Sequence, residues 1–263
     1  MYNYSANTQY IGKQFLYLTT CHSTNDLAKT LNTRGLCKNG MVIFTENQTH
    51  GRGQQGTLWL SEPGQNLTFS IVLRLNQLPL ASQFLFNKAL SIHLLGFFRT
   101  YFSNSQDVFH IKWPNDVYLN GKKIAGMLLE NSLSGSHITS SIVGIGLNVN
   151  QQVFEFPTAS SLSIIMDRSI DRYDLLHSLL KYLDENLPLN FESLSMPEIQ
   201  TIHNVYEATL WGLHEQRWFQ AAADPFIATL KGVDEQGLLI LETNQGIERF
   251  EIKSIQFLNH PVD

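Results

Sequence analysis

Cysteine is scarce in this sequence. Only Cys21 and Cys37 occur among 263 residues, without a C-x-x-C pair or a metal-binding spacing. A disulfide-stabilised secreted scaffold is therefore excluded, and a reducing, cytoplasmic setting is expected. Positive charge is also in short supply, because 18 Lys and Arg stand against 23 Asp and Glu, giving a net charge of −5. This balance argues against a general nucleic-acid binder.

The chain also lacks a long uninterrupted hydrophobic run. Its most apolar stretch, 84–102, contains Asn87, Lys88, His93 and Arg99, so a half-buried helix is predicted there and no membrane span. The first residues show no basic segment followed by an apolar core, and no signal peptide is expected. With 43% hydrophobic and 16% charged residues, the composition is typical of a globular protein with a sizeable core.

Hydrophobic periodicity predicts an α+β fold in which a mixed β-sheet is flanked by helices. Strands are expected at 15–19, 41–48, 66–75, 116–119, 123–130 and 140–150, the fourth and fifth joined by an Asn-Gly turn. Helices are expected after the N-cap chemistry of 23–25, over 82–102 and over 171–187.

From about Leu210 the pattern changes to short alternating strands. Turns are predicted at 234–237 and 244–246, and five short strands in some fifty residues indicate a small β-barrel. The sequence thus predicts two domains, 1–208 and 209–263.

The segment 51–56 reads GRGQQG. It lacks the G-K-[ST] ending of a P-loop, and a strand follows it where a dinucleotide fingerprint needs a helix. A plain turn before a strand is one interpretation. A ligand-binding loop is the other, because Arg52 lies between two glycines and can approach a carboxylate or phosphate closely and bind it in bidentate fashion.

A second polar cluster is KWPND at 112–116. Pro114 favours an extended conformation for the residue before it, which places Asn115 and Asp116 at the start of a strand where polar side chains can border a cleft. The carboxylate of Asp116 is a candidate Mg²⁺ ligand, because that ion prefers oxygen donors and shares them with phosphates.

Two further positions leave alternatives open. Lys122 and Lys123 are adjacent on a predicted strand, so their side chains face opposite sides and at most one of them enters a cleft. Asn148, in the apolar GIGLNV segment, is a buried polar side chain that needs partners. It is interpreted either as a structural hydrogen-bonding residue or as a ligand contact.

Four segments, in this order, resemble the motif series of the biotin–protein ligases, also called biotin–[acetyl-CoA carboxylase] ligases. They are STNDLA (23–28), GRGQQGTLWLSEPGQNL (51–67), KWPNDVYLNGKKIAGMLLE (112–130) and GIGLNV (144–149). The resemblance covers 19–258, and the tail is similar to the SH3-like C-terminal domain of that family. It implies a class II synthetase-like catalytic domain followed by that small domain.

The resemblance implies an enzyme that makes biotinyl-5′-AMP from biotin and ATP, releases pyrophosphate, and transfers biotin to a lysine of a biotin carboxyl carrier domain of an acyl-CoA carboxylase. Mg²⁺ would accompany the ATP. Members that also repress transcription carry an N-terminal winged helix, and the stretch before Ser23 is too short for one. No DNA or membrane partner is therefore expected, and both a monomer and a homodimer stay open.

The resemblance also implies site residues. Those expected at biotin are Ser23, Thr24, Asn25, Gln48, Gly51, Arg52, Lys123, Gly126 and Gly144. Those expected at ATP or the adenylate are Arg52, Gly53, Gln54, Trp59, Lys112, Asn115 and Asn148. The implied catalytic residues are Arg52, Lys112, Asp116 and Lys123, with Asp116 also the Mg²⁺ ligand. Gly146 would let the backbone approach the ligand, and the glycines of 51–56 would let this loop act as a lid.

One departure from the family concerns Gln54, Gln55 and Thr57, where some members have arginine. The arginine that replaces Gln54 in those members helps to retain the adenylate. Closure of the loop is expected to depend here on Arg52, Trp59 and backbone amides. Asp116 is one candidate for the base that deprotonates the acceptor lysine.

Two other functions stay open. A lipoate or octanoyl ligase or transferase would share the catalytic fold, but those proteins lack KWPND and the C-terminal module. A non-catalytic biotin sensor is the second alternative. The presence of Arg52, Lys112, Asp116 and Lys123 argues against it, because capture of biotin alone needs no residues for ATP phosphates.

Overall fold

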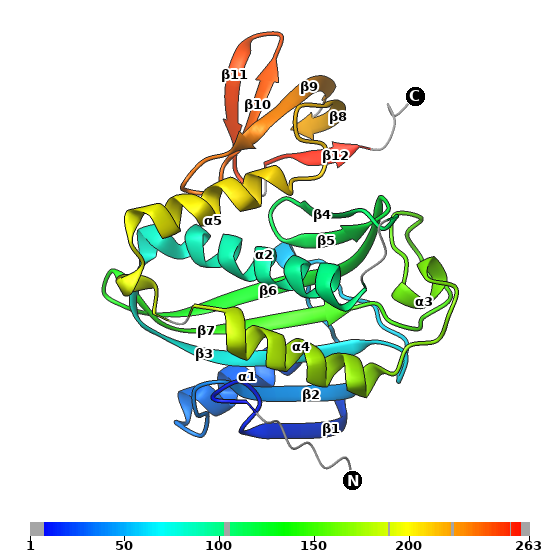
Figure 1. The fold of residues 1–263 in the computed structure, drawn as a ribbon, viewed down its shortest axis with the longest axis vertical. Helices are drawn as coiled ribbons and strands as arrows, with labels where there is room; N and C mark the ends of the chain where they lie inside the picture. Colours follow the sequence, from blue (N-terminus) through cyan, green and yellow to red (C-terminus); the bar gives the residue numbers. More distant parts are fainter. Residues whose placement is uncertain (1–7, 103–105, 189, 222–223, 253, 259–263) are drawn as a thin grey trace.

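The computed structural model describes residues 8–102, 106–188, 190–221, 224–252 and 254–258, and these form two β-sheets with helices around the larger one (Figure 1). The described strands of the larger sheet are β1 (Phe15–Cys21), β2 (Met41–Gln48), β3 (Leu67–Pro79), β4 (Phe109–Lys112), β5 (Asp116–Leu119), β6 (Lys122–Ser134) and β7 (His137–Leu147). Those of the smaller sheet are β8 (Gln216–Ala221), β9 (Asp224–Val233), β10 (Leu239–Thr243), β11 (Gly246–Phe250) and β12 (Gln256–Leu258). The helices are α1 (Thr24–Thr33), α2 (Gln83–Tyr101), α3 (Leu162–Ile165), α4 (Arg172–Asn186) and α5 (Met196–Ala208), with 3₁₀ turns η1 (Gln54–Gly56), η2 (Leu80–Ser82) and η3 (Phe191–Ser193).

The larger sheet is mixed, with the strand order β1-β2-β3-β7-β6-β5-β4. β1 and β2 are parallel, and the other neighbouring strands are antiparallel. A parallel pair needs a crossover, and α1 supplies it. The predicted α+β architecture, a mixed sheet flanked by helices, is confirmed.

Alternation along β2 divides the core between the two faces of the sheet. Val42 and Phe44 are fully buried in the large core that includes the apolar faces of α2 and α4. Met41 and Ile43 point the other way, into a smaller core that contains Ala28 of α1. Successive strand residues face opposite sides of a sheet, so the almost continuous apolar run of β2 follows from burial on both of its faces.

The sequence prediction missed the helices α3 and α5 and the strand β4, and it misplaced the end of β7. α5 was not predicted, although Ser195 and Glu198 form a capping box at its start. β7 begins at His137 and ends at Leu147, so Asn148 lies just beyond the strand and not on it. Within the described residues, no helix is long and apolar enough to cross a membrane, and α2 takes the place of the predicted half-buried helix.

The smaller, antiparallel sheet has the order β11-β10-β9-β8-β12 and is fixed to the main body through backbone carbonyls. Lys88 of α2 is 1% exposed, and its Nζ donates to the carbonyl oxygens of Val233 at 3.3 Å and Asp234 at 3.1 Å. Burial lowers the pKa of the Lys88 amine to about 8. Trp113 Nε1 donates to the carbonyl oxygen of Gly237 at 3.0 Å. The turn between β9 and β10 is thus held by Lys88 of α2 and by Trp113, which directly follows β4.

The predicted division into 1–208 and 209–263 stays a prediction, as does the SH3-like character of the second part. α5 ends at Ala208, and the first strand of the smaller sheet begins at Gln216. The outermost residues of both predicted domains, 1–7 and 259–263, lie outside the described residues.

Candidate active site

A pocket of about 570 Å³ lies over β6 and β7, between the 51–59 loop and the smaller sheet. It brings together fourteen of the sixteen predicted site residues: Ser23, Thr24, Asn25, Gln48, Arg52, Gly53, Gln54, Trp59, Lys112, Asn115, Asp116, Lys123, Gly126 and Gly144. Gly51 and Asn148 do not line it.

Three glycines of β6 and β7 form the floor of the pocket, and each lies directly beneath a polar or aromatic side chain. A Cβ atom on Gly146 would lie 2.2 Å from Cε2 of Trp59, and one on Gly144 would lie 2.3 Å from Oδ1 of Asn25. Gly126 is paired with Gly146 across the two strands. At Gly144 and Gly146, even a methyl group would displace the side chain that lies on the floor.

A buried hydrogen-bond network occupies one end of the pocket. The backbone N–H of Thr24 donates to Gln48 Oε1 at 2.8 Å, and Ser70 Oγ donates to Asn25 Oδ1 at 2.6 Å. Asn25 Nδ2 donates to Glu130 Oε2 at 2.9 Å. These polar groups are therefore fixed before any ligand arrives. Sequence reasoning identified Thr24, Asn25 and Gln48 but missed Ser70 and Glu130.

The 51–59 loop forms a narrow hairpin across the pocket. Gly53 N–H donates to the Thr57 carbonyl at 2.7 Å, and Trp59 N–H donates to the Gly51 carbonyl at 2.9 Å, with η1 at the tip. Trp59 thereby lies over Gly146, and its buried Nε1 has no hydrogen-bond partner among the described residues. Gly51 supports the loop from behind: a Cβ there would lie 2.3 Å from the Trp59 carbonyl oxygen.

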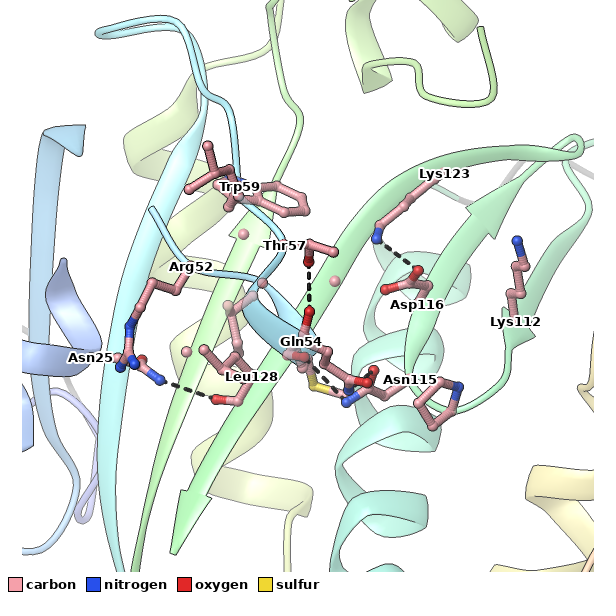
Figure 2. Close-up of a pocket in the computed structure, with 18 of the residues that line it drawn as sticks. Asn25, Arg52, Gln54, Thr57, Trp59, Lys112, Asn115, Asp116, Lys123 and Leu128 are labelled. Atoms are coloured by element: carbon pink, nitrogen blue, oxygen red, sulfur yellow. Dashed lines mark hydrogen bonds and ion pairs between the residues drawn. The ribbon is translucent and has the colours of Figure 1, made fainter. Parts of the chain in front are cut away.

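Arg52 is bound to two carboxylates that the sequence prediction did not include. Its Nη2 lies 2.7 Å from Asp26 Oδ1 and 2.7 Å from Glu130 Oε2. Figure 2 shows Arg52 at one end of the pocket and Lys123 with Asp116 at the other. The predicted cations therefore fall into two groups on either side of the loop.

The second group lies where β5 meets β6. Lys123 Nζ forms an ion pair with Asp116 Oδ2 at 2.7 Å, and both residues line the pocket. Lys122, its neighbour, instead donates from Nζ to the Pro157 carbonyl at 2.6 Å. The structure thus brings one lysine of the pair into the pocket, as the alternation of strand side chains predicts.

A hydrogen bond joins the loop to the KWPND segment. Gln54 Nε2 donates to Asn115 Oδ1 at 2.8 Å, and Asn115 Nδ2 donates to the Met127 carbonyl at 3.2 Å. Asn115 is 1% exposed, so its orientation is fixed. Gln54, one of the positions that depart from the family pattern, is therefore a contact between the loop and the pocket wall. The side chain of Gln55 lies outside the described part of the structure.

Asn148 forms structural hydrogen bonds, which was one of the two interpretations of this residue. Its Nδ2 donates to the Ser160 carbonyl at 3.0 Å, and its backbone N–H donates to the Ile124 carbonyl at 2.8 Å. It is 4% exposed and does not line the pocket. The predicted contact of Asn148 with the adenylate stays a prediction.

The smaller sheet contributes pocket-lining residues that sequence reasoning missed. These are Ile252, Ile255, Gln256 and Phe257, in and just before β12. No sequence motif identifies these residues, because a short strand of mixed apolar and polar residues occurs in many β-domains. The pocket is consequently built by both sheets.

The fold and the pocket place the chain in a known class. The Biotin/lipoate A/B protein ligase family matches residues 17–148, just over half of the sequence, and the chain belongs to this family.

Named relatives lie in the biotin branch of the family. The chain is 27% identical over 258 residues to the "Bifunctional ligase/repressor BirA" of Bacillus subtilis, covering 96% of this chain and 77% of that protein. It is 40% identical over 134 residues to the "Biotin--[acetyl-CoA-carboxylase] ligase" of Paracoccus denitrificans, covering 50% of this chain and 53% of that protein. Among solved structures, the biotin protein ligase of Aquifex aeolicus in complex with biotin and ATP is similar, with a TM-score of 0.74, 26% identity, and coverage of 94% of this chain and 99% of that one.

Proposed function

We propose that this chain is an ATP-dependent biotin–protein ligase. It activates biotin as biotinyl-5′-AMP, releases pyrophosphate, and transfers biotin to a lysine of a biotin carboxyl carrier domain. One observation carries the proposal: the buried network around Asn25 and the cationic group around Lys123 face the same glycine floor. A carboxylic acid and a nucleotide can therefore lie end to end in one pocket.

The buried network suits the polar ring of biotin. A ureido ring offers two N–H donors and one carbonyl acceptor, and Thr24, Asn25 and Gln48 present hydroxyl and amide groups that are already oriented. Preorganised polar groups bind a matching ligand without the cost of ordering themselves. Ligands that lack these polar groups would leave the network without partners, which is unfavourable.

The first chemical step joins two anions. An oxygen of the biotin carboxylate forms a bond to the α-phosphorus of ATP while the bond from that phosphorus to the bridging oxygen breaks and pyrophosphate leaves. Lys112 and Lys123 at one end and Arg52 at the other offset the repulsion. Catalysis of this kind depends on alignment and on charge stabilisation in a site that excludes water.

In the second step the amine of the acceptor lysine attacks the acyl carbonyl, and AMP leaves. The mixed anhydride must be kept from water until then, and Trp59 and the hairpin loop cover the floor on which it would lie. Asp116 is a candidate base for the incoming amine, and its carboxylate is paired with Lys123.

Magnesium fits this site as an ion that arrives with the nucleotide. No cluster of three or more His, Cys, Asp or Glu side chains suited to a metal occurs among the described residues. Mg²⁺ commonly uses one or two carboxylates together with substrate phosphates, and Asp116 is the carboxylate that lines the pocket near Lys112 and Lys123. When bound, the ion would neutralise phosphate charge.

The acceptor we propose is the carrier domain of an acyl-CoA carboxylase, in agreement with the name of the Paracoccus denitrificans relative. We also propose a cytoplasmic enzyme that binds neither DNA nor membranes. Its function is compatible with a monomer or a homodimer.

A substrate comparison tests the proposed function. The chain is incubated with ATP, Mg²⁺ and either biotin or lipoate, and pyrophosphate release is measured. Release with biotin and none with lipoate is the expected result. Release with lipoate alone would assign the chain to the lipoate branch. If neither acid gives pyrophosphate release but calorimetry shows that biotin binds, the chain is a biotin sensor.

The substitution Gln54→Ala tests how the loop is closed. It removes one neutral hydrogen bond to Asn115, so biotin-dependent pyrophosphate release is expected to fall by no more than about tenfold, or about 1.4 kcal/mol. Single-turnover rates of adenylate formation measure this directly. A loss of several hundredfold would show that Gln54 itself, and not Arg52, Trp59 and the backbone, keeps the loop closed.

A further inference from the structure

Lys112 differs from the other lysine in the pocket, because aromatic rings surround it. Its Nζ lies 5.3 Å from the ring centroid of Tyr118, 5.6 Å from that of Trp211 and 5.2 Å from that of Phe257. It donates one long hydrogen bond, 3.3 Å, to the Tyr118 hydroxyl. We refer to these three rings as the aromatic cage.

The cage holds the ammonium without neutralising it. Lys123 forms an ion pair with Asp116 at 2.7 Å, whereas Lys112 has no ion pair with any residue that the structure describes. Burial lowers the pKa of Lys112, and the charges of Lys123 and Arg217 lower it further, against the opposing effect of Asp116. Aromatic faces attract a cation but accept few hydrogen bonds, so the N–H donors of Lys112 are kept for an anion in the pocket.

Two of the three rings belong to the C-terminal part of the chain. Trp211 follows α5, and its backbone N–H donates to the Ile111 carbonyl at 2.8 Å, directly beside Lys112. Phe257 lies on β12, where it is paired with Phe219 of β8. The position of Lys112 therefore depends on where the smaller sheet is held.

A second cation supports Trp211. The guanidinium carbon of Arg217 lies 3.7 Å from the centroid of the Trp211 ring. Arg217 reaches this place because Gly212 has no side chain: a Cβ there would lie 2.2 Å from Arg217 Nε, and the backbone φ of +80° favours glycine. The Trp211 ring is thus stacked in place from within the smaller sheet.

We propose that Trp211 and Phe257 are positioning residues that hold Lys112 toward the nucleotide phosphates, so that these two rings set the affinity of the pocket for ATP and not for biotin. This inference rests on the proposed function for the identity of the anion. It extends that function by assigning a role in ATP binding to two aromatic side chains around Lys112.

The test compares Phe257→Leu and Trp211→Leu with the unaltered protein. Each is expected to raise the KM for ATP about tenfold and leave the KM for biotin within about twofold, as expected when one of several cation–π contacts is lost. Trp211→Phe, which keeps a ring, should restore most of the affinity. Phe226→Leu is the matched control: Phe226 packs on Phe219 and Phe250 in the same sheet without contacting Lys112, and its KM values should not change.

A double substitution separates positioning from general damage. In a Lys112→Met background, Phe257→Leu is expected to have no further effect on the KM for ATP. Equal rises in both KM values, or losses that add in the double variant, would overturn the inference. Titration calorimetry with ATP alone keeps the test independent of catalysis. If the chain binds ATP but does not activate biotin, the proposed function is wrong. The calorimetric titrations then still show whether the aromatic cage affects ATP binding.

Discussion

Replacing Lys123 by alanine is expected to lower biotin-dependent pyrophosphate release several hundredfold. The substitution removes a cation from the place where phosphate charge develops, and it also leaves the Asp116 carboxylate, now 2.7 Å from Nζ, without its partner. An uncompensated anion beside the phosphates adds repulsion to the lost attraction. Removing one preorganised donor to a developing negative charge typically costs a factor of roughly 10² to 10³.

The adjacent lysine provides a matched control. Lys122 has the same side chain and is adjacent in sequence, but its Nζ donates to the Pro157 carbonyl. Lys122→Ala should leave the rate within about twofold, as surface substitutions usually do. Equal losses in the two variants would contradict the assignment, as would a Lys123→Ala rate close to that of the unaltered protein. Thermal unfolding of both variants excludes a loss that comes from misfolding.

The substitution Gly146→Ala is expected to raise the KM for ATP about thirtyfold, or about 2 kcal/mol. The new methyl group would lie 2.2 Å from Cε2 of Trp59. The backbone hydrogen bonds of the loop place the indole at this point, so the indole must move off the pocket floor to make room for the methyl group. Burial of an aromatic ring is worth about 2 kcal/mol or more, and this contribution to nucleotide binding would be lost. Tryptophan fluorescence should report the displacement.

A double-mutant cycle tests whether displacement of Trp59 causes the rise in the KM for ATP. If Gly146→Ala acts by displacing Trp59, then in a Trp59→Ala background it should change the KM for ATP by less than about threefold. Independent, multiplying effects of the two substitutions would show that the methyl group excludes ATP directly and that Trp59 does not mediate the loss.

The sequence predicted most of the larger sheet, because its strands bury one or both faces and show clear apolar patterns. β2 is the plainest case, since Val42, Ile43 and Phe44 are all fully buried. α5 was missed although apolar residues recur every third position along it, at Met196, Ile199, Ile202 and Val205. Of its residues, only Ile202 and Tyr206 are buried. The capping box of Ser195 and Glu198 was the local signal that could have revealed it.

The candidate site, too, could be predicted only in part from the sequence. Residues within one motif, such as Asn115 and Asp116, are adjacent by covalent connection, and the resemblance could identify them. Contacts between distant segments could not be predicted from the sequence. Arg52 and Glu130 are separated by 78 positions, yet they share an ion pair. Phe257 contacts Lys112 from β12, the last described strand. Both depend on how the sheets pack, for which no local pattern exists.

The attachment of the smaller sheet has a consequence for exchange of modules between relatives. Lys88 and Trp113 donate hydrogen bonds to its backbone carbonyl oxygens, those of Val233, Asp234 and Gly237. Backbone carbonyls are supplied by any sequence that forms this turn, so a chimaera carrying the C-terminal sheet of another ligase should dock correctly. The rings around Lys112 are side chains and would not be inherited with the turn. Docking and substrate affinity can therefore diverge separately during evolution of the family.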